Sequence, residues 1–157
     1  MSRTCWKADL ADVRVDFYQL AGAPAEQVIA GISEKIVAGD GRLIVVADDE
    51  VLLARLDRML WDQEATSFLP HGVAGGADDA RQPILLSTSP DAPNLARNML
   101  IADGIWRDSA LTYDRAFFLF DATTLEDARA SWRSLAGREG VEPRYWARED
   151  GKWVQKG

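Results

Sequence analysis

The chain has 157 residues, one cysteine and an apolar fraction of 47%, which predicts one globular domain of ordinary size. A single cysteine excludes an internal disulfide, and the longest apolar runs, five residues each, exclude a membrane-spanning helix. Residues 1–128 carry 11 basic and 21 acidic side chains, a net charge of −10, whereas residues 129–157 carry a net +3. The acidic body argues against extended, tight nucleic-acid binding, and the basic end, with three of the six tryptophans, suggests a small acidic partner.

The first half of the chain alternates strand and helix patterns. Val13 to Leu20 alternates apolar and polar residues and is predicted to be a strand. A helix is expected from Ala25 to Ala38, and a strand buried on both faces from Leu43 to Ala47. Asp48 or Asp49 is expected to cap the next helix, which runs to about Trp61.

The second half begins with residues 62–82, which are expected to form a long surface loop. Short strands are predicted at 84–87, 98–102 and 117–120, with a helical turn near 107–113. Thr124 is expected to cap a helix that runs to about Gly137. Finally, Asp150-Gly151 lies between aromatic-rich segments, as in a β-hairpin.

Alternating strands and helices predict a three-layer α/β/α fold with a mostly parallel, Rossmann-like sheet of about five strands. We expect the C-terminal aromatic and basic hairpin to be added to this sheet. Residues 1–157 are predicted to form a single domain, with residues 1–12 as an extension, and Met1 to Leu10 has no secretory signal pattern. A cytoplasmic protein is therefore expected.

The motifs of nucleotide enzymes are missing from the sequence. Neither G-x-x-x-x-G-K-[ST] nor a G-x-G-x-x-G after the first strand occurs, so no cofactor is expected. An alternative hypothesis is a small α/β enzyme, a hydrolase or nucleotide-binding protein, that uses Asp48, Asp49 and His71. A pair of Cys5 with His71, the only histidine, could in principle form a nucleophile.

Two segments are candidate binding surfaces. The first contains Trp61 and the run Phe68-Leu69-Pro70-His71, whose aromatic rings either anchor a protein partner or fold back onto the sheet edge. The second is the last helix, where Arg129 and Arg133 are four residues apart with Trp132 between them. Like charges at this spacing favour an anion nearby, but Arg129 could equally pair with Glu126.

The order of several blocks resembles the DNA polymerase III chi subunit family, over about residues 13–140. The blocks are Val15-Asp16-Phe17-Tyr18-Gln19-Leu20, Val45-Val46-Ala47-Asp48-Asp49-Glu50, Leu56-Asp57-Arg58-Met59-Leu60-Trp61, Ser67-Phe68-Leu69-Pro70-His71-Gly72, Pro83-Ile84-Leu85-Leu86 and Ala128-Arg129-Ala130-Ser131-Trp132-Arg133.

The resemblance implies a non-catalytic accessory subunit of the clamp-loader assembly of the replicative polymerase. It also implies binding of the acidic C-terminal tail of single-stranded DNA-binding protein, through Arg129, Trp132 and Arg133. The surface of Trp61, Phe68, Leu69, Pro70 and His71 is implied to contact the psi subunit or another replication partner. One departure is Leu125, which stands near a position where the family can place a basic residue.

Overall fold

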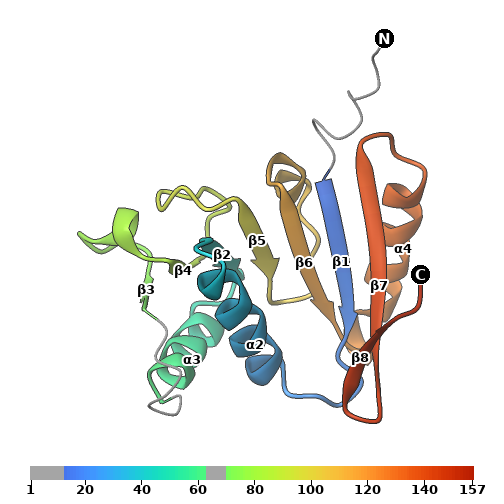
Figure 1. The fold of residues 1–157 in the computed structure, drawn as a ribbon, viewed down its shortest axis with the longest axis horizontal. Coiled ribbons are helices and arrows are strands. Elements are labelled where there is room, and N and C mark those ends of the chain that lie inside the picture. The colour runs from blue at the N-terminus through green and yellow to red at the C-terminus, as the bar shows by residue number, and fades with distance from the viewer. Residues whose placement is uncertain (1–12, 63–69) are drawn as a thin grey trace.

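The computed structural model describes residues 13–62 and 70–157, and Figure 1 shows the arrangement of its helices and strands. The three helices are α2 (Ala25–Ala38), α3 (Glu50–Trp61) and α4 (Leu125–Ala136). The eight strands are β1 (Val13–Gln19), β2 (Leu43–Val46), β3 (His71–Val73), β4 (Ile84–Ser87), β5 (Asn98–Ile101), β6 (Arg115–Phe120), β7 (Val141–Glu149) and β8 (Lys152–Gln155).

All eight strands belong to one sheet with the order β3-β4-β2-β5-β6-β1-β7-β8. Every neighbouring pair is parallel except β7 and β8, which form an antiparallel hairpin. The predicted α/β class and mostly parallel sheet are therefore confirmed. The prediction of a single domain over residues 1–157 stays a prediction, although one sheet joins all the described strands.

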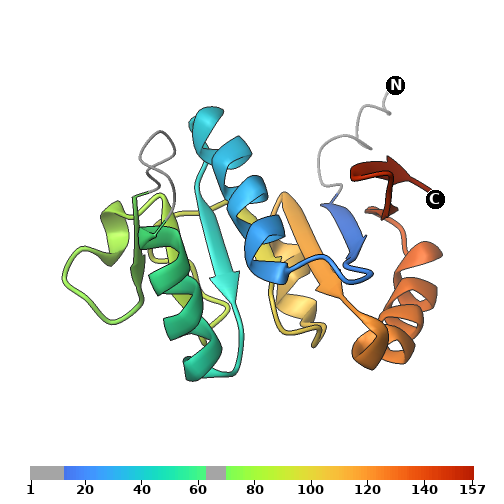
Figure 2. The same ribbon diagram turned by 90° about the horizontal axis from the view of Figure 1, so that it is seen from below.

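The sheet has an apolar core on each face, because its central strands are buried on both sides. Side chains of α2 and α3, such as Ile29 and Leu56, pack on one face against Val45 and Leu100. Helix α4 lies on the opposite face (Figure 2), where its Ala128 and Leu135 belong to the second core. These three layers explain why Leu43–Val46 reads as a continuous apolar run.

The sheet has more strands than expected, because the segment 62–82 is not only a loop. It contains β3, which pairs with β4 at the sheet edge, and a 3₁₀ turn at Asp79–Arg81. A strand of three residues that includes Gly72 is too short to show an alternating pattern. Gly72 is thus part of a strand, and a Cβ there would lie 3.2 Å from the Gln82 side chain.

The hairpin turn at Asp150-Gly151 joins β7 to β8. Both residues have positive φ angles, 54° and 77°, as a two-residue type I′ turn requires. β7 also pairs in parallel with β1, so the hairpin extends the main sheet. None of the helices among the described residues combines the length and the apolarity needed to cross a membrane.

The helix caps differ from expectation in one case. Asp49 caps α3 by accepting a hydrogen bond from the Val51 N–H at 2.8 Å. Thr124 makes no side-chain cap for α4. Instead Asp121 and Thr124 form a capping box around the 3₁₀ turn Ala122–Thr124 that leads into α4, because an Asp at the start of the turn can accept from two N–H groups.

Candidate functional site

A pocket of about 350 Å³ lies between α4 and the sheet, on the face opposite α2. Helix α4 turns Leu125, Ala128 and Trp132 toward strands β1, β6 and β7, because these positions are spaced three or four residues apart. The pocket is lined by Phe17, Gln19, Phe120, Leu125, Ala128, Arg129, Trp132, Arg133 and Tyr145.

Aromatic rings from four elements form the apolar part of this pocket. The Trp132 ring meets Phe17 edge to face, with centroids 5.2 Å apart, and Tyr145 at 6.4 Å. Phe120 stacks beside Tyr145 at 6.3 Å. The Tyr145 hydroxyl donates a hydrogen bond to Oε1 of Gln19 and is thereby held in place. The rings therefore form a preorganised cavity that suits one planar, apolar group.

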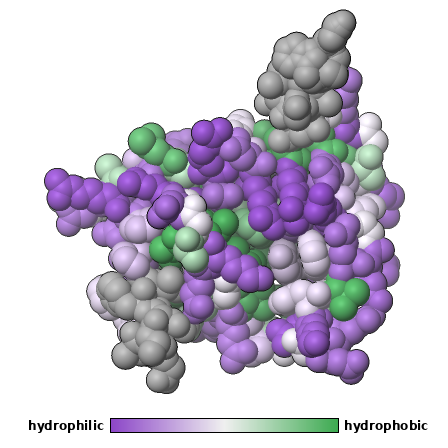
Figure 3. All heavy atoms as spheres, in the orientation of Figure 1, coloured by the Kyte–Doolittle hydropathy of each residue, from purple (hydrophilic) through white to green (hydrophobic). Residues whose placement is uncertain are grey.

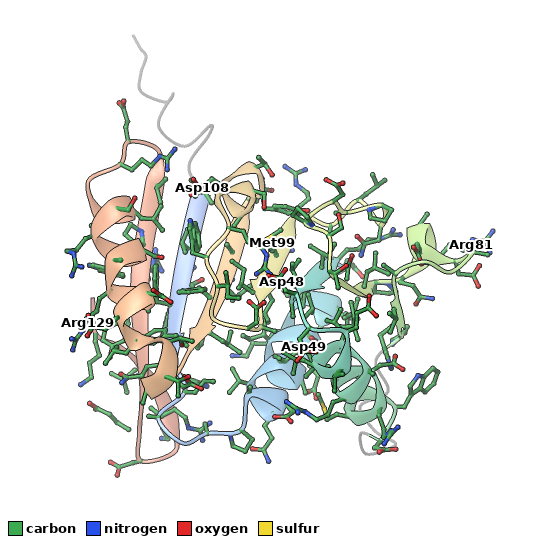
Figure 4. The ribbon with its side chains drawn as sticks, turned by 180° about the vertical axis from the view of Figure 1, so that it is seen from behind. Asp48, Asp49, Arg81, Met99, Asp108 and Arg129 are labelled. Carbon is green, nitrogen blue, oxygen red and sulfur yellow. The ribbon has the colours of Figure 1, made fainter. Side chains whose placement is uncertain are left out.

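Two arginines stand at the edge of the pocket. Arg129 projects from the outer side of α4 (Figure 4). Its Nη1 lies 3.2 Å from Oε2 of Glu126, so the pairing considered from the sequence is present. Both side chains are exposed, 59% and 82%, and an exposed pair at this spacing is worth only a few tenths of a kcal/mol. Arg133 is exposed and forms no ion pair with any described residue. An incoming anion can therefore recruit both guanidinium groups.

The structure brings Arg129, Trp132 and Arg133 to one pocket and adds residues that the sequence analysis missed. Phe17 and Phe120 were expected only as strand residues, and Tyr145 only as part of the hairpin. The pairing of β1 with both β6 and β7 aligns Phe17 with Phe118 and Tyr145, which brings these aromatic residues together. The clustering of aromatics in the basic end was the one sequence signal for Tyr145.

The second predicted surface lies at the opposite edge of the sheet, beside β3. Trp61 is the last residue of α3 and 57% exposed, and its ring lies 4.8 Å from that of His71. His71 is buried, and its Nε2 lies 3.1 Å from both the backbone oxygen and Oδ1 of Asp57. The buried His71 ring therefore packs against the partly exposed Trp61 ring. Pro70 is exposed, whereas Phe68 and Leu69 lie outside the described residues.

Comparison with known proteins gives one decisive match. Residues 13–143 match the family model described as DNA polymerase III chi subunit, HolC. The chain belongs to the DNA polymerase III chi subunit family. No curated protein matched the sequence. As a member of the chi family, the protein is an accessory subunit of DNA polymerase III.

The chi-family fold does not bring together the residues of the alternative enzyme hypothesis. His71 is in register with Ile84 and, through β4, with Leu43 at the beginning of β2. Asp48 and Asp49 follow the end of β2, at the opposite edge of the parallel sheet (Figure 4). His71 and the pair Asp48 and Asp49 therefore lie at opposite ends of the parallel strands. Cys5 lies outside the described residues.

The carboxyl edge of the sheet, where α/β proteins commonly bind ligands, carries an ion-pair cluster in this chi-family member. Nη2 of Arg107 lies 2.8 Å from Oδ1 of Asp48 and 3.0 Å from Oδ2 of Asp103. Burial alone would raise the pKa of Asp103, but hydrogen bonds from Arg107 and from the backbone N–H groups of Asp48 and Ile105 lower that pKa. Arg107 thus pairs with two of the acidic residues at this edge, Asp48 and Asp103.

Proposed function

We propose that the pocket under α4 binds the acidic, Phe-ended C-terminal tail of single-stranded DNA-binding protein, which would recruit this chi-family subunit to the replication fork. The proposal rests on one observation: an aromatic cavity made by Phe17, Trp132 and Tyr145 lies beside Arg129 and Arg133 in the same pocket.

The chemistry of the pocket suits such a tail. A terminal phenylalanine ring fits against Trp132 in the cavity, while the terminal carboxylate and neighbouring aspartates accept charge-assisted hydrogen bonds from Arg129 and Arg133. Leu125 adds apolar surface to the pocket, near a position where the family can place a basic residue. Compared with a pocket that has three basic residues, this pocket therefore depends more on burial of the terminal phenylalanine ring of the tail.

The expected affinity is micromolar. Burial of one phenylalanine contributes about 1.5–3 kcal/mol, and each charged hydrogen bond contributes about 1.5–3 kcal/mol before the entropic cost of association. A dissociation constant in this range corresponds to a binding free energy of about −7 to −8 kcal/mol. Binding should weaken with salt because both arginines are exposed.

Fluorescence anisotropy with a labelled tail peptide tests this proposal. Arg129→Glu should weaken binding more than tenfold, because the substitution reverses the charge at the pocket edge. Arg138→Glu, an equal charge change at an exposed residue after α4, should have little effect. A peptide without its terminal phenylalanine should also fail to bind. Undiminished binding by Arg129→Glu combined with Trp132→Ala would place the tail elsewhere.

We further propose that the surface around Trp61 and Pro70 binds the psi subunit or another replication partner. An exposed tryptophan beside a proline is a typical interface anchor, and His71 and Asp57 hold its ring in position. Trp61→Ala should reduce capture of purified psi while leaving the thermal unfolding midpoint nearly unchanged. Val51→Ala, at an exposed position on the same helix, is the matched control. Unchanged capture by Trp61→Ala would refute this assignment.

A further inference from the structure

On the α2 side of the sheet, no helix formed by residues 13–62 or 70–157 covers β1 and β7. Helix α2 lies in front of the middle of the sheet, and β8 is the edge strand beside β7 (Figure 1). Between them is a groove of about 470 Å³, within the usual range for a small-ligand site. This groove faces away from the pocket under α4, because successive residues of a strand point to opposite faces. Tyr18 lines the groove, whereas Phe17 lines the pocket.

The groove is positively charged, although the whole chain carries −7. Four of its lining residues are cationic and none is acidic: Arg14, Lys35, Arg115 and Arg148. Lys35 and Arg148 form no ion pair with any residue in the described ranges. Hydrophilic side chains cover the middle of this face, over β6 and β1 (Figure 3). Its charge therefore complements an anionic ligand.

The buried carboxylate of Asp16 holds three of the lining residues of the groove, Arg14, Arg115 and Trp146. Its Oδ1 lies 3.1 Å from Arg14 and accepts a hydrogen bond from the Trp146 indole at 2.9 Å, and its Oδ2 lies 2.8 Å from Arg115. Because Arg14 and Arg115 both pair with this single carboxylate, the cluster keeps a net positive charge. Asp16 also fixes the orientation of the Trp146 ring.

Partly exposed aromatic rings lie among the cations. Tyr18 and Trp146 are nearly parallel, with ring planes 12° apart, and Trp153 meets Tyr18 edge to face at 5.0 Å. The Arg148 guanidinium lies 5.3 Å above the Trp153 ring. Burial and then the charge of Asp16 raise the pKa of Tyr18, so its hydroxyl stays neutral at physiological pH. Cations therefore flank planar rings on this face.

Gly31 supplies an independent observation. It lies within α2 and lines the groove, but a Cβ at this position would meet no protein atom within 4 Å. Neither tight packing nor a positive φ angle requires a glycine here, although glycine is unfavourable within a helix. The missing side chain leaves room in the groove for another molecule.

We propose that this groove binds a short stretch of single-stranded nucleic acid, with phosphates on Arg14, Lys35 and Arg148 and a base stacked on Trp146 or Trp153. Alternation of cations with planar rings matches the alternation of phosphates with bases. An acidic peptide could use the cations but has no planar groups to stack on the exposed parts of these rings. The site is short and the rest of the chain is acidic, so binding is weak and depends strongly on salt, as the charge distribution of the sequence also requires.

Fluorescence anisotropy with labelled dT10 at 50 mM salt tests the proposal. Lys35→Gln should weaken binding and make the salt dependence shallower by about 0.7 in the log–log slope. Trp153→Leu should weaken binding about tenfold through lost stacking. Gly31→Met should block the groove without changing any charge. The matched control is Arg81→Gln, which removes a charge at the opposite end of the sheet (Figure 4).

Three further probes distinguish the source of binding. An abasic oligomer of the same charge should bind at least tenfold more weakly than dT10. A U10 oligomer tests RNA against DNA, and either sugar satisfies the proposal. The proposal is overturned if dT10 does not bind the wild-type protein, if the abasic oligomer binds equally well, or if Arg81→Gln has the same effect as Lys35→Gln. Tighter binding of a deca-glutamate peptide than of dT10 would instead identify an acidic protein partner. This outcome is independent of the tail-peptide measurement, which probes the other face.

Discussion

Asp16 shows how one residue can have a different role from the one its pattern indicates. It alternates with Val15 and Phe17 in the first strand, which predicts a solvent-exposed side chain. In the structure it is completely buried beneath Arg14, Arg115 and Trp146. A buried carboxylate is tolerated only when it is paired and hydrogen-bonded, and these three partners come from β1, β6 and β7.

Replacement of Asp16 should therefore be costly. Asp16→Ala leaves two guanidinium groups and an indole N–H without their shared acceptor, and we expect the free energy of unfolding to fall by about 2–4 kcal/mol. Urea unfolding measures this change. Asp114→Ala, which breaks an exposed pair with Arg97, should cost less than about 1 kcal/mol. Equal costs for the two variants would contradict a structural role for Asp16.

At the level of the secondary-structure elements, Asp103 joins the ends of β2 and β5. It accepts hydrogen bonds from the Asp48 and Ile105 backbone and from Arg107. These bonds outweigh the effect of burial, so the pKa of Asp103 in the folded protein lies below the ordinary 3.8. A lowered folded-state pKa means that the ionised form stabilises the fold above pH 3.8 and that this contribution is lost as the pH falls through the folded-state value.

Asp103→Asn should therefore flatten the acid dependence of stability. We expect the difference in urea midpoint between pH 5 and pH 2.5 to be smaller in this variant than in the wild-type protein. Glu139→Gln, which removes an exposed carboxylate, should leave the difference nearly unchanged. If the urea midpoint of Asp103→Asn falls between pH 5 and pH 2.5 as much as that of the wild-type protein, other acidic residues cause the loss of stability.

The start of α4 is a second feature at this scale. Asp121 accepts hydrogen bonds from the N–H groups of Thr123 and Thr124, which positions the helix that carries Arg129 and Trp132. Asp121→Ala should lower the free energy of unfolding by about 1 kcal/mol, measured by urea denaturation. If the cap also positions the pocket, the affinity for the tail peptide should fall in Asp121→Ala as well. The control variant is Asp127→Ala, because Asp127 lies in the first turn of α4 but outside the capping box.

At the scale of the whole molecule, the two proposed ligands occupy opposite faces of one sheet. The pocket is lined by Phe17 and Trp132, and the groove by Tyr18 and Trp146. At 0.1 M salt the Debye length is about 10 Å, so charges on one face are largely screened from the other. The tail peptide and dT10 should therefore bind simultaneously.

Titration of labelled dT10 into protein saturated with unlabelled tail peptide measures this independence. The dissociation constant for dT10 should change less than twofold. Displacement of the peptide by dT10 would show that both ligands use one surface, and the assignment of two separate sites would then be wrong.

Local patterns were sufficient to predict most of the elements and the α/β class. The boundaries of α2 and α3 follow from 3.6-residue periodicity. The apolar runs at Leu43–Val46 and Phe117–Phe120 predict strands, the first of them buried on both faces. The strand β3 was missed because three residues carry no readable period. The basic and aromatic character of the C-terminal end was also visible in the sequence.

Only the tertiary structure decided which distant residues share a site. Phe17, Trp132 and Tyr145 meet because β1 lies between β6 and β7, and no local pattern specifies this strand order. The same pairing buries Asp16 and opens the groove on the other face. Periodicity reports which side of an element is buried, whereas strand pairing depends on contacts between segments more than 100 residues apart, such as Asp16 with Trp146.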